Sequence, residues 1–372
     1  MNVVVAAGGT GGHLYPAIAV AREFLRQDPA TRVVFVGTSR GIESTVLAHE
    51  GFELELIAAK PLMGKRLWER VRALAVLPTS FGQSWRVLGK RQADLVIGVG
   101  GYTSPTVLLA ALLRRIPSVI LEPNAYPGLA NRVVAPFARR IFLAFESTRR
   151  FFTQTTVRVV GMPVRRAFLE QRAAGEKRAM PGERHLLIFG GSQGAKAINA
   201  AMIEALPALR AIGGLRITHQ TGTQDHERVA AAYREAGYET AEIVPFLYDM
   251  PAVLRSADLV VARAGGMTVA ELTVCGKPAI LIPLPTAIYN HQALNAAVME
   301  SVGAAVVLPQ AELTGARLAD TIAAILNDQD RLHSMSAGSA GIGRSDAAEA
   351  IVRECYDLMG RRHEINRRVG AV

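Results

Sequence analysis

Cysteine is nearly absent from this chain, which has only Cys275 and Cys355 among its 372 residues. Two isolated cysteines exclude a disulfide framework and argue against a cysteine-based metal site, as is typical of a reducing cytoplasm. Long hydrophobic runs are missing too, because residues 106–113 fall well short of the roughly 18 to 20 residues of a spanning helix. The first residues enter a predicted strand without a basic leader, so we expect no signal peptide and a soluble or peripherally bound protein.

Aromatic residues are scarce, at 6%, and acidic residues are outnumbered, with 32 Asp and Glu against 42 Lys and Arg. The formal net charge of +10 predicts attraction to an anionic partner: nucleic acid, a membrane surface or a phosphorylated substrate. Few aromatic residues are available to build a base-stacking platform, so we expect no nucleic-acid partner. The sequence names no protein partner.

What the chain does contain is a regular alternation of short apolar runs and helical patterns. Near-continuous apolar runs are typical of parallel strands that are buried on both faces. They occupy residues 2–7, 32–37, 54–59, 94–100, 117–123 and 140–145, and then 185–191, 215–222, 241–246, 258–266 and 278–285. Strands joined repeatedly by helical crossovers predict α/β domains with doubly wound parallel sheets.

The chain also repeats one plan, since residues 2–25 and 185–206 both pass from a strand through a glycine turn into a helix. We therefore predict two Rossmann-like domains, at 1–163 and 164–343. The boundary is placed where Gly161 and Pro163 break the pattern. A last segment, 344–372, is predicted as a helix that packs back on the first domain, followed by a basic tail.

The two glycine turns, GGTGGH and GGSQGAK, sit where doubly wound domains bind ligands, at the carboxyl ends of strands. A helix that begins after such a turn offers backbone N–H groups and a positive end to a diphosphate. Neither turn has dinucleotide spacing, and the second strand lacks a terminal acid. The second turn also fails as a P-loop, because Lys196 is not followed by Ser or Thr. A tight turn with no ligand remains the alternative for either one.

The stretch DLVVARAGGMTVAEL, residues 258–272, is the most informative. Its helix is predicted to start near Thr268, and Glu271 has the spacing of a capping box, which is the structural interpretation. In the functional interpretation, Glu271 accepts the hydroxyls of a ribose while the N–H groups of residues 266–268 bind phosphates. In residues 290–296, His291, Gln292 and Asn295 either read sugar hydroxyls or form an ordinary polar cap.

Taken together, these motifs resemble the MurG family of N-acetylglucosaminyltransferases. The matching stretches occur in the family's order: GGTGGHLYPA, GVGGYTSPT, EPNAYPGLANR, GMPVR, GGSQGAKAIN, PFLYDM, RAGGMTVAEL and HQALNA. The resemblance implies a GT-B fold, with two Rossmann-like domains facing across a cleft. It further implies transfer of GlcNAc from UDP-GlcNAc to the undecaprenyl-linked acceptor lipid I, giving lipid II for peptidoglycan synthesis. The place implied is the cytoplasmic face of the plasma (inner) membrane.

The resemblance assigns roles residue by residue. In the first domain it implies acceptor-side positions at Thr10, Gly11 and Gly12, with Tyr102 as a further substrate contact and Asn124 on the donor sugar. The residues implied for the nucleotide and its sugar are Arg165, Ser192, Phe246, Leu247, Gly266, Met267, Thr268, Val269, Ala270, Glu271 and Gln292. Where the family often has His-Glu-x-Asn, this chain has Leu121-Glu122-Pro123-Asn124, so a role for that histidine cannot be transferred.

The reaction implied is attack of the MurNAc 4-hydroxyl on the anomeric carbon of UDP-GlcNAc, with inversion. His13 lies at the start of the first helix, with Pro16 placed as a first-turn proline. The positive helix end disfavours imidazolium, so we predict His13 as the general base, with a cap or phosphate donor as the alternative. The helix N-terminus at 266–271 is expected to stabilise the departing UDP, so neither a metal nor another cofactor is expected.

Residues 60–91 carry eight Lys or Arg among apolar residues and the tryptophans Trp68 and Trp85, with Glu69 as the single acid. This composition suits a surface that rests on anionic lipid headgroups, although a solvated basic face over core helices has the same signature. Three competing functions remain open at this point: a glycolipid glycosyltransferase, a UDP-GlcNAc epimerase, and a nucleotide-sugar sensor without catalysis.

Overall fold

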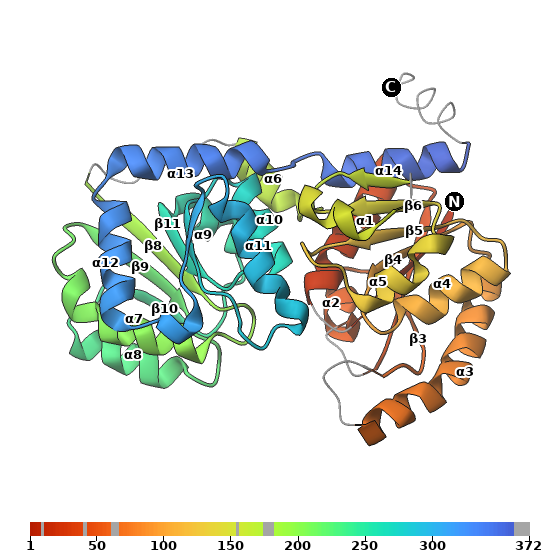
Figure 1. Ribbon diagram of the computed structural model, residues 1–372, viewed down its shortest axis with the longest axis horizontal. Coiled ribbons are helices and arrows are strands. Elements are labelled where there is room, and N and C mark those ends of the chain that lie inside the picture. Colours follow the sequence, from red (N-terminus) through yellow and green to blue (C-terminus); the bar gives the residue numbers. More distant parts are fainter. Residues whose placement is uncertain (9–10, 40–42, 61–66, 154–155, 174–181, 361–372) are drawn as a thin grey trace. The chain divides into compact units, whose positions relative to one another are not determined.

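The computed structural model describes residues 1–8, 11–39, 43–60, 67–153, 156–173 and 182–360. The chain forms two compact units, one of Met1–Arg165 with Arg344–Val372 and one of Arg166–Gly343 (Figure 1). The division after Arg165 falls close to the predicted boundary after residue 163. The segment that begins at residue 344 belongs to the first unit.

The first unit contains a parallel seven-stranded sheet in the order β3-β2-β1-β4-β5-β6-β7. Its strands are β1 (Asn2–Ala7), β2 (Arg32–Gly37), β3 (Glu53–Leu56), β4 (Leu95–Gly100), β5 (Ser118–Glu122), β6 (Arg140–Leu143) and β7 (Val157–Val159). The chain winds outward from β1 to β3 and then restarts at β4, so the order of the sheet switches between β1 and β4. Ligands of doubly wound sheets bind at such a switch point.

Helices cover both faces of this sheet. One face carries α1 (Gly11–Gln27), α2 (Glu43–His49) and α14 (Ala347–Leu358), and the other carries α3 (Leu67–Lys90), α4 (Ser104–Leu113) and α5 (Leu129–Val134). Two 3-10 helices follow, η1 (Ala135–Phe137) and η2 (Glu146–Phe151). Helix α14 joins this core through buried Ile351, Val352 and Tyr356, and the Tyr356 ring meets the edge of Phe24 at 5.5 Å between centroids. Burial of these side chains ties the end of the described chain to α1.

The second unit has a parallel six-stranded sheet in the order β10-β9-β8-β11-β12-β13, which switches between β8 and β11. Its strands are β8 (Arg184–Phe189), β9 (Leu215–Gln220), β10 (Glu242–Val244), β11 (Leu259–Ala262), β12 (Ala279–Leu281) and β13 (Ala305–Val307). One face is covered by α7 (Lys196–Leu209), α8 (His226–Glu235) and α12 (Gly315–Leu326). The other elements are α6 (Arg166–Ala173), α9 (Met250–Ser256), α10 (Gly266–Val274), η3 (Ile288–Asn290), α11 (His291–Glu300), η4 (Gln310–Glu312) and α13 (Gln329–Ile342).

The predicted α/β class with doubly wound parallel sheets is confirmed, and every predicted apolar run contains a strand. The strands β7 and β13 were not predicted. Each is a strand of three residues at the edge of its sheet. No helix in the part of the chain that the structure describes has both the length and the apolar character needed to cross a membrane.

Candidate active site

In the first unit, His13 lies at the switch point between β1 and β4. Gly100 ends β4 with φ +107°, and a Cβ built there would lie 3.0 Å from Cδ2 and 3.1 Å from Nε2 of His13. The neighbouring Gly101 has φ +77°, and a Cβ on it would overlap the carbonyl oxygen of Gly8. These glycines thus let the turn after β4 approach the turn after β1 and place the His13 ring against the backbone. A side chain at Gly100 would displace that ring.

Helix α1 begins at Gly11, so Gly11, Gly12 and His13 are its first residues. Thr10 lies outside the described residues. Pro16 was predicted in the first turn but stands one turn further in, where its ring removes the N–H that would reach the Gly12 carbonyl. His13 is half-buried in the first turn, where the unpaired N–H groups of a helix and its positive end are found.

The buried carboxyl group of Glu122 organises the loop after β5. Its Oε1 accepts from the backbone N–H of Asn124 at 3.0 Å and from Asn124 Nδ2 at 3.4 Å. Its Oε2 accepts from Gly128 N–H at 3.0 Å and from Asn131 Nδ2 at 2.9 Å. Burial raises the pKa of Glu122 to about 7, while these donors act in the opposite direction. The carboxylate thereby holds Asn124, one of the predicted sugar contacts, from two sides.

Sequence reasoning missed Glu122 and Asn131 as functional candidates. Asn131 is buried, and its Nδ2 lies 3.5 Å from the point where a Cβ on Gly100 would stand, beside His13. The sequence did offer one signal for Glu122, which is a glutamate at the end of an apolar strand. A carboxyl group buried at the end of such a strand needs hydrogen-bond donors. The donors lie two, six and nine residues later, in the loop before α5 and on α5 itself, and no local pattern predicts that they converge on Glu122.

Tyr102 and Arg165 are the other predicted residues of the first unit. The Tyr102 hydroxyl and Thr38 Oγ1 are 3.1 Å apart, which joins the turn after β4 to the end of β2. The Arg165 guanidinium lies over the Tyr15 ring, 5.1 Å from its centroid. This cation–π contact places the guanidinium beside α1 at the end of this unit.

In the second unit, the turns after β8 and β11 meet at the switch point. The turn after β8 contains Gly191 and Gly194 with φ +91° and +71°, backbone that other residues rarely adopt. Ser192 lies between them and is exposed, so its hydroxyl is accessible to a ligand. Helix α7 starts at Lys196 with no side-chain cap on its N-terminal N–H groups. The end of this turn can therefore accept an anion.

The capping-box interpretation of Thr268 and Glu271 is wrong. Helix α10 begins at Gly266 with extended Gly265 as its N-cap, so Thr268 is not the N-cap residue. Because the first intrahelical bond runs from Val269 N–H to Gly265, the N–H groups of residues 266–268 precede it and have no carbonyl within the helix. Val269 and Ala270 are buried, which leaves only their backbone to a ligand. Glu271 is half-buried one turn into the helix.

Arg263 directly follows β11 and was not predicted as part of the site. Its guanidinium donates to the carbonyl oxygens of Ile282 and Pro283 at 3.0 and 3.3 Å and to Gln310 Oε1 at 2.7 Å. Burial lowers the pKa of Arg263. These bonds tie the chain after β11 to the chain after β12 and so fix where α10 starts. Arg263 acts here as a scaffold for the turn.

Phe246 and Leu247, predicted beside the uracil, follow β10. Phe246 is 41% exposed and meets the edge of Tyr248 at 5.1 Å between ring centroids, whereas Leu247 is buried. Of the two predicted residues, Phe246 therefore has a ring open to stack on a base, whereas Leu247 can offer only its backbone.

Gln292 is the second residue of α11, after two left-handed residues, Tyr289 and Asn290, with φ 56° and 53°. Its Oε1 accepts from Leu284 N–H at 2.9 Å. The amide is thereby oriented, and Nε2 is the group left to face a ligand. A contact from Gln292 to sugar hydroxyls, as the sequence predicts, would therefore use the amide as a donor.

A Gln292→Glu variant keeps the acceptor for Leu284 but loses the donor. We expect the KM for UDP-GlcNAc to rise by about 5- to 150-fold, the equivalent of 1–3 kcal/mol for an unmet hydrogen bond, with unchanged affinity for UDP. Titration calorimetry with UDP and steady-state kinetics measure the two quantities. Gln329→Glu, at the exposed start of α13, is the control. Parallel loss of UDP and UDP-GlcNAc affinity would contradict a contact to the sugar.

Comparison with known proteins identifies the family. The model of the glycosyltransferase family 28 N-terminal domain matches residues 3–143, and that of its C-terminal domain matches residues 185–351. A Myxococcus xanthus protein is 44% identical over 364 residues, 96% of this chain and 93% of its own length. Its name is UDP-N-acetylglucosamine–N-acetylmuramyl-(pentapeptide) pyrophosphoryl-undecaprenol N-acetylglucosamine transferase. The chain belongs to the MurG family of glycosyltransferases.

Another relative that carries the same enzyme name, from Geobacter sulfurreducens, is 46% identical over 95% of this chain and 98% of its own. The crystal structure of MurG from Acinetobacter baumannii has a TM-score of 0.76 at 29% identity, covering 94% of this chain and 98% of that one. The predicted GT-B fold is thereby confirmed. A putative UDP-N-acetylglucosamine 2-epimerase from Listeria monocytogenes, with a TM-score of 0.70 at 14% identity over 97% of each chain, shares the fold alone.

Proposed function

We propose that this chain transfers GlcNAc from UDP-GlcNAc to the 4-hydroxyl of MurNAc in lipid I, producing lipid II for peptidoglycan synthesis. The observation that carries the proposal is the enzyme name shared by relatives 44% and 46% identical over nearly the whole chain. As a member of this family the chain is a hexosyltransferase. The epimerase and glycolipid alternatives are not favoured, because the epimerase likeness extends to the fold only.

The donor is held by the second unit. The N–H groups of residues 266–268 and the positive end of α10 bind the diphosphate, Glu271 accepts the ribose hydroxyls, and Gln292 donates to the sugar. The Phe246 ring stacks on the uracil. As the bond to the anomeric carbon breaks, charge develops on the UDP oxygen, and the oriented N–H groups stabilise it without rearranging. In this proposal UDP leaves without a metal ion or another cofactor.

The acceptor is activated by the first unit. His13 takes the proton of the MurNAc 4-hydroxyl as its oxygen attacks the anomeric carbon from the face opposite UDP, which inverts that centre. The turn at Gly11 and Gly12 faces the acceptor diphosphate. Asn124, held by Glu122, touches the donor sugar, Arg165 contacts the nucleotide, and Tyr102 is a further substrate contact. General-base catalysis of this kind contributes about 10²- to 10⁴-fold to a rate.

The decisive test mixes the purified protein with UDP-[14C]GlcNAc and a short-chain lipid I analogue. Labelled disaccharide lipid is the expected product. Release of UDP or of free sugar without labelled lipid would refute transfer to this acceptor and favour a hydrolase or an epimerase.

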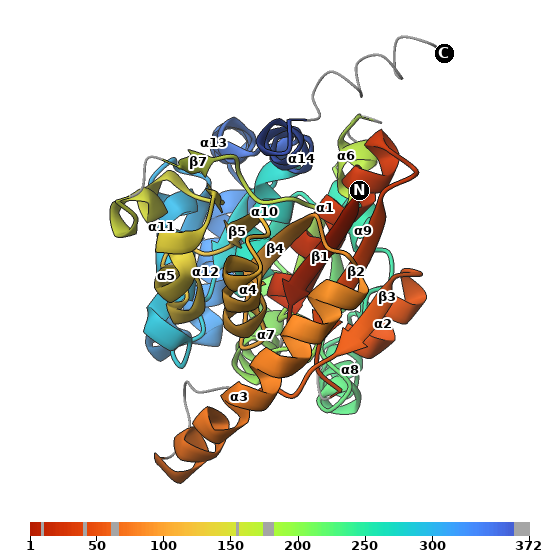
Figure 2. The same cartoon turned by 90° about the vertical axis from the view of Figure 1, so that its right-hand side faces the viewer.

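We further propose that the first unit rests on the cytoplasmic face of the plasma membrane through α3 and the neighbouring α4. Exposed apolar side chains gather on these helices: Trp68, Leu74, Leu77 and Trp85 on α3, and Leu109 and Leu113 on α4. Figure 2 shows the two helices side by side at the flank of the sheet. Arg114 lies over the Trp85 ring at 4.2 Å, and Arg86 and Arg115 are exposed nearby in sequence. The basic charge selects an anionic bilayer. Residues 61–66 of the predicted stretch lie outside the described part.

Replacing Trp68 and Leu74 by serine should reduce binding to vesicles that contain anionic phosphatidylglycerol. We expect the partition coefficient to fall by at least about tenfold, because the two side chains each contribute 1.5–3 kcal/mol when buried. Co-sedimentation measures it. Val302→Ser, an exposed apolar residue of the second unit, is the control. Equal binding of wild type to neutral and anionic vesicles, or no effect of the double change, would contradict this surface.

A further inference from the structure

The turn after β8 is held in place by the chain that follows β9. A Cβ on Gly194 would overlap the carbonyl oxygen of Thr221, and one on Gly222 would overlap the carbonyl oxygen of Gln193. The two backbones are therefore in direct contact, and only glycine permits this approach. The position of Ser192, between Gly191 and Gly194, follows from the position of residues 221 and 222.

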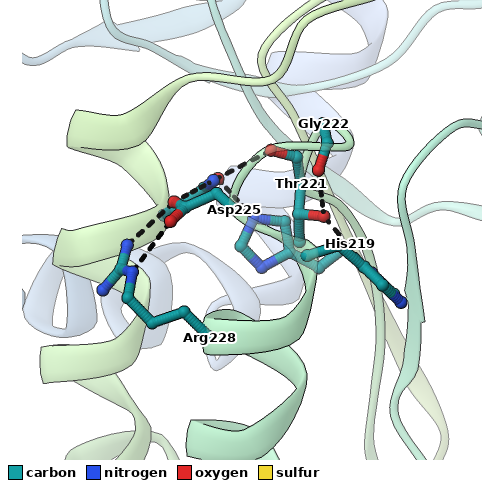
Figure 3. A network of polar contacts seen from close by, with 7 residues as sticks. His219, Thr221, Gly222, Asp225 and Arg228 are labelled. Carbon is teal, nitrogen blue, oxygen red and sulfur yellow. Dashed lines mark hydrogen bonds and ion pairs between the residues drawn. The ribbon is translucent and has the colours of Figure 1, made fainter.

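A buried asparagine on α7 fixes that second segment. Asn199 Nδ2 donates to the Thr221 carbonyl at 2.9 Å and to Asp225 Oδ2 at 2.7 Å. Asp225 is in turn clamped by Arg228 with two bonds of 2.8 Å (Figure 3). The hydrogen bond from Arg228 lowers the pKa of Asp225 to about 2, so this carboxylate accepts at neutral pH. Both N–H protons of the Asn199 side-chain amide are thereby donated, one to the Thr221 carbonyl and one to Asp225.

The orientation of that amide decides the tautomer of His219. Asn199 Oδ1 must accept, so His219 Nε2, 3.1 Å away, carries the proton. His219 Nδ1 then accepts from the Tyr233 hydroxyl at 3.0 Å. Burial lowers the pKa of His219 to about 3, which keeps the ring neutral. The result is one directed chain from Tyr233 through His219 and Asn199 to the Thr221 carbonyl.

We propose that Asn199 is a positioning residue for the donor nucleotide, and that His219 orients it. Asn199 donates a hydrogen bond to the Thr221 carbonyl, and this carbonyl packs against Gly194. The position of Gly194 in turn determines where Ser192 and the start of α7 lie. In this proposal Tyr233, His219 and Asn199 act through the backbone and do not contact the ligand. The inference rests on the proposed function, because it takes the turn after β8 as part of the UDP-GlcNAc site.

The test compares Asn199→Ala and His219→Gln with wild type. Titration calorimetry gives the dissociation constant for UDP, and kinetics give the KM for UDP-GlcNAc and for the short-chain lipid I analogue. We expect Asn199→Ala to weaken UDP and raise the donor KM by about tenfold or more, since small misplacements of a binding group are costly. His219→Gln, which still offers a donor to Asn199, should shift both values by less. The acceptor KM should stay unchanged.

The matched control is His185→Gln. His185 is also buried and bonded at both ring nitrogens, to Thr218 Oγ1 at 2.9 Å and Ser256 Oγ at 3.1 Å, but it lies at the start of β8, away from the turn. It should lose stability without losing UDP affinity. Wild-type UDP affinity in folded Asn199→Ala, or equal losses in Asn199→Ala and His185→Gln, would overturn the proposal. If Asn199→Ala does not fold, an unchanged KM for UDP-GlcNAc in His219→Gln would overturn the proposal instead. Absence of transfer by wild type would instead refute the proposed function.

Discussion

Replacing His13 by alanine is expected to lower turnover by about 10²- to 10⁴-fold, the usual contribution of a general base. The KM for UDP-GlcNAc should change little, because His13 is proposed to act on the acceptor hydroxyl and not to contact the donor. His13 stands in the first turn of α1 with its ring against Gly100, at the switch point where a substrate of this fold binds. Single-turnover kinetics with saturating UDP-GlcNAc and the lipid I analogue measure the chemical step directly.

Two controls separate chemistry from structure at His13. His49→Ala changes an exposed histidine at the end of α2 in the same unit and should leave turnover unchanged. Free imidazole added to His13→Ala should restore part of the rate, because it can occupy the space left by the ring and accept the proton. Normal turnover in His13→Ala would remove this residue from catalysis.

Replacing Glu122 by alanine should destabilise the first unit by about 3–5 kcal/mol, since N–H donors on Asn124, Gly128 and the buried Asn131 would lose their acceptor. Turnover should fall as well, because Asn124 is no longer held. Urea unfolding measures the free energy.

Titration of Glu122 should make the stability of the first unit fall as the pH rises. Desolvation raises its folded pKa from 4.5 to about 7, so between these values the folded state binds the proton more tightly than the unfolded state. Its contribution to stability is fully present below pH 4.5, is lost as the pH rises to about 7, and is constant above. Relative to Glu122→Gln, which does not titrate, wild type should lose about 3 kcal/mol between pH 4.5 and 8.

Glu55→Gln provides the control for that series. The hydrogen bond from Lys90 lowers the pKa of Glu55, so Glu55 is ionised in both folded and unfolded states above pH 5 and its contribution should be flat from there to pH 8. If the difference between wild type and Glu122→Gln is equally flat, the four donors keep the carboxylate ionised despite its burial.

The sequence by itself determined the two parallel sheets, the glycine turns and the family. Strands buried on both faces must be apolar along their whole length, so apolar runs such as residues 2–7 and 32–37 can be recognised as strands. The turns can also be recognised in the sequence, because the positive φ at Gly191 and Gly194 favours a residue without a Cβ. The edge strands β7 and β13 were not identified in this way.

Only the tertiary structure decided how the polar side chains are used. Thr268 and Glu271 have the spacing of a cap, yet α10 starts at Gly266, because the chain leaves β11 through extended Gly265. Glu122 accepts hydrogen bonds from the loop after β5 and from Asn131 on α5, and Gln292 is oriented by Leu284 N–H from the turn after β12. A hydrogen bond depends on distance and direction within fractions of an ångström, which local pattern does not encode, whereas apolar burial depends mainly on composition.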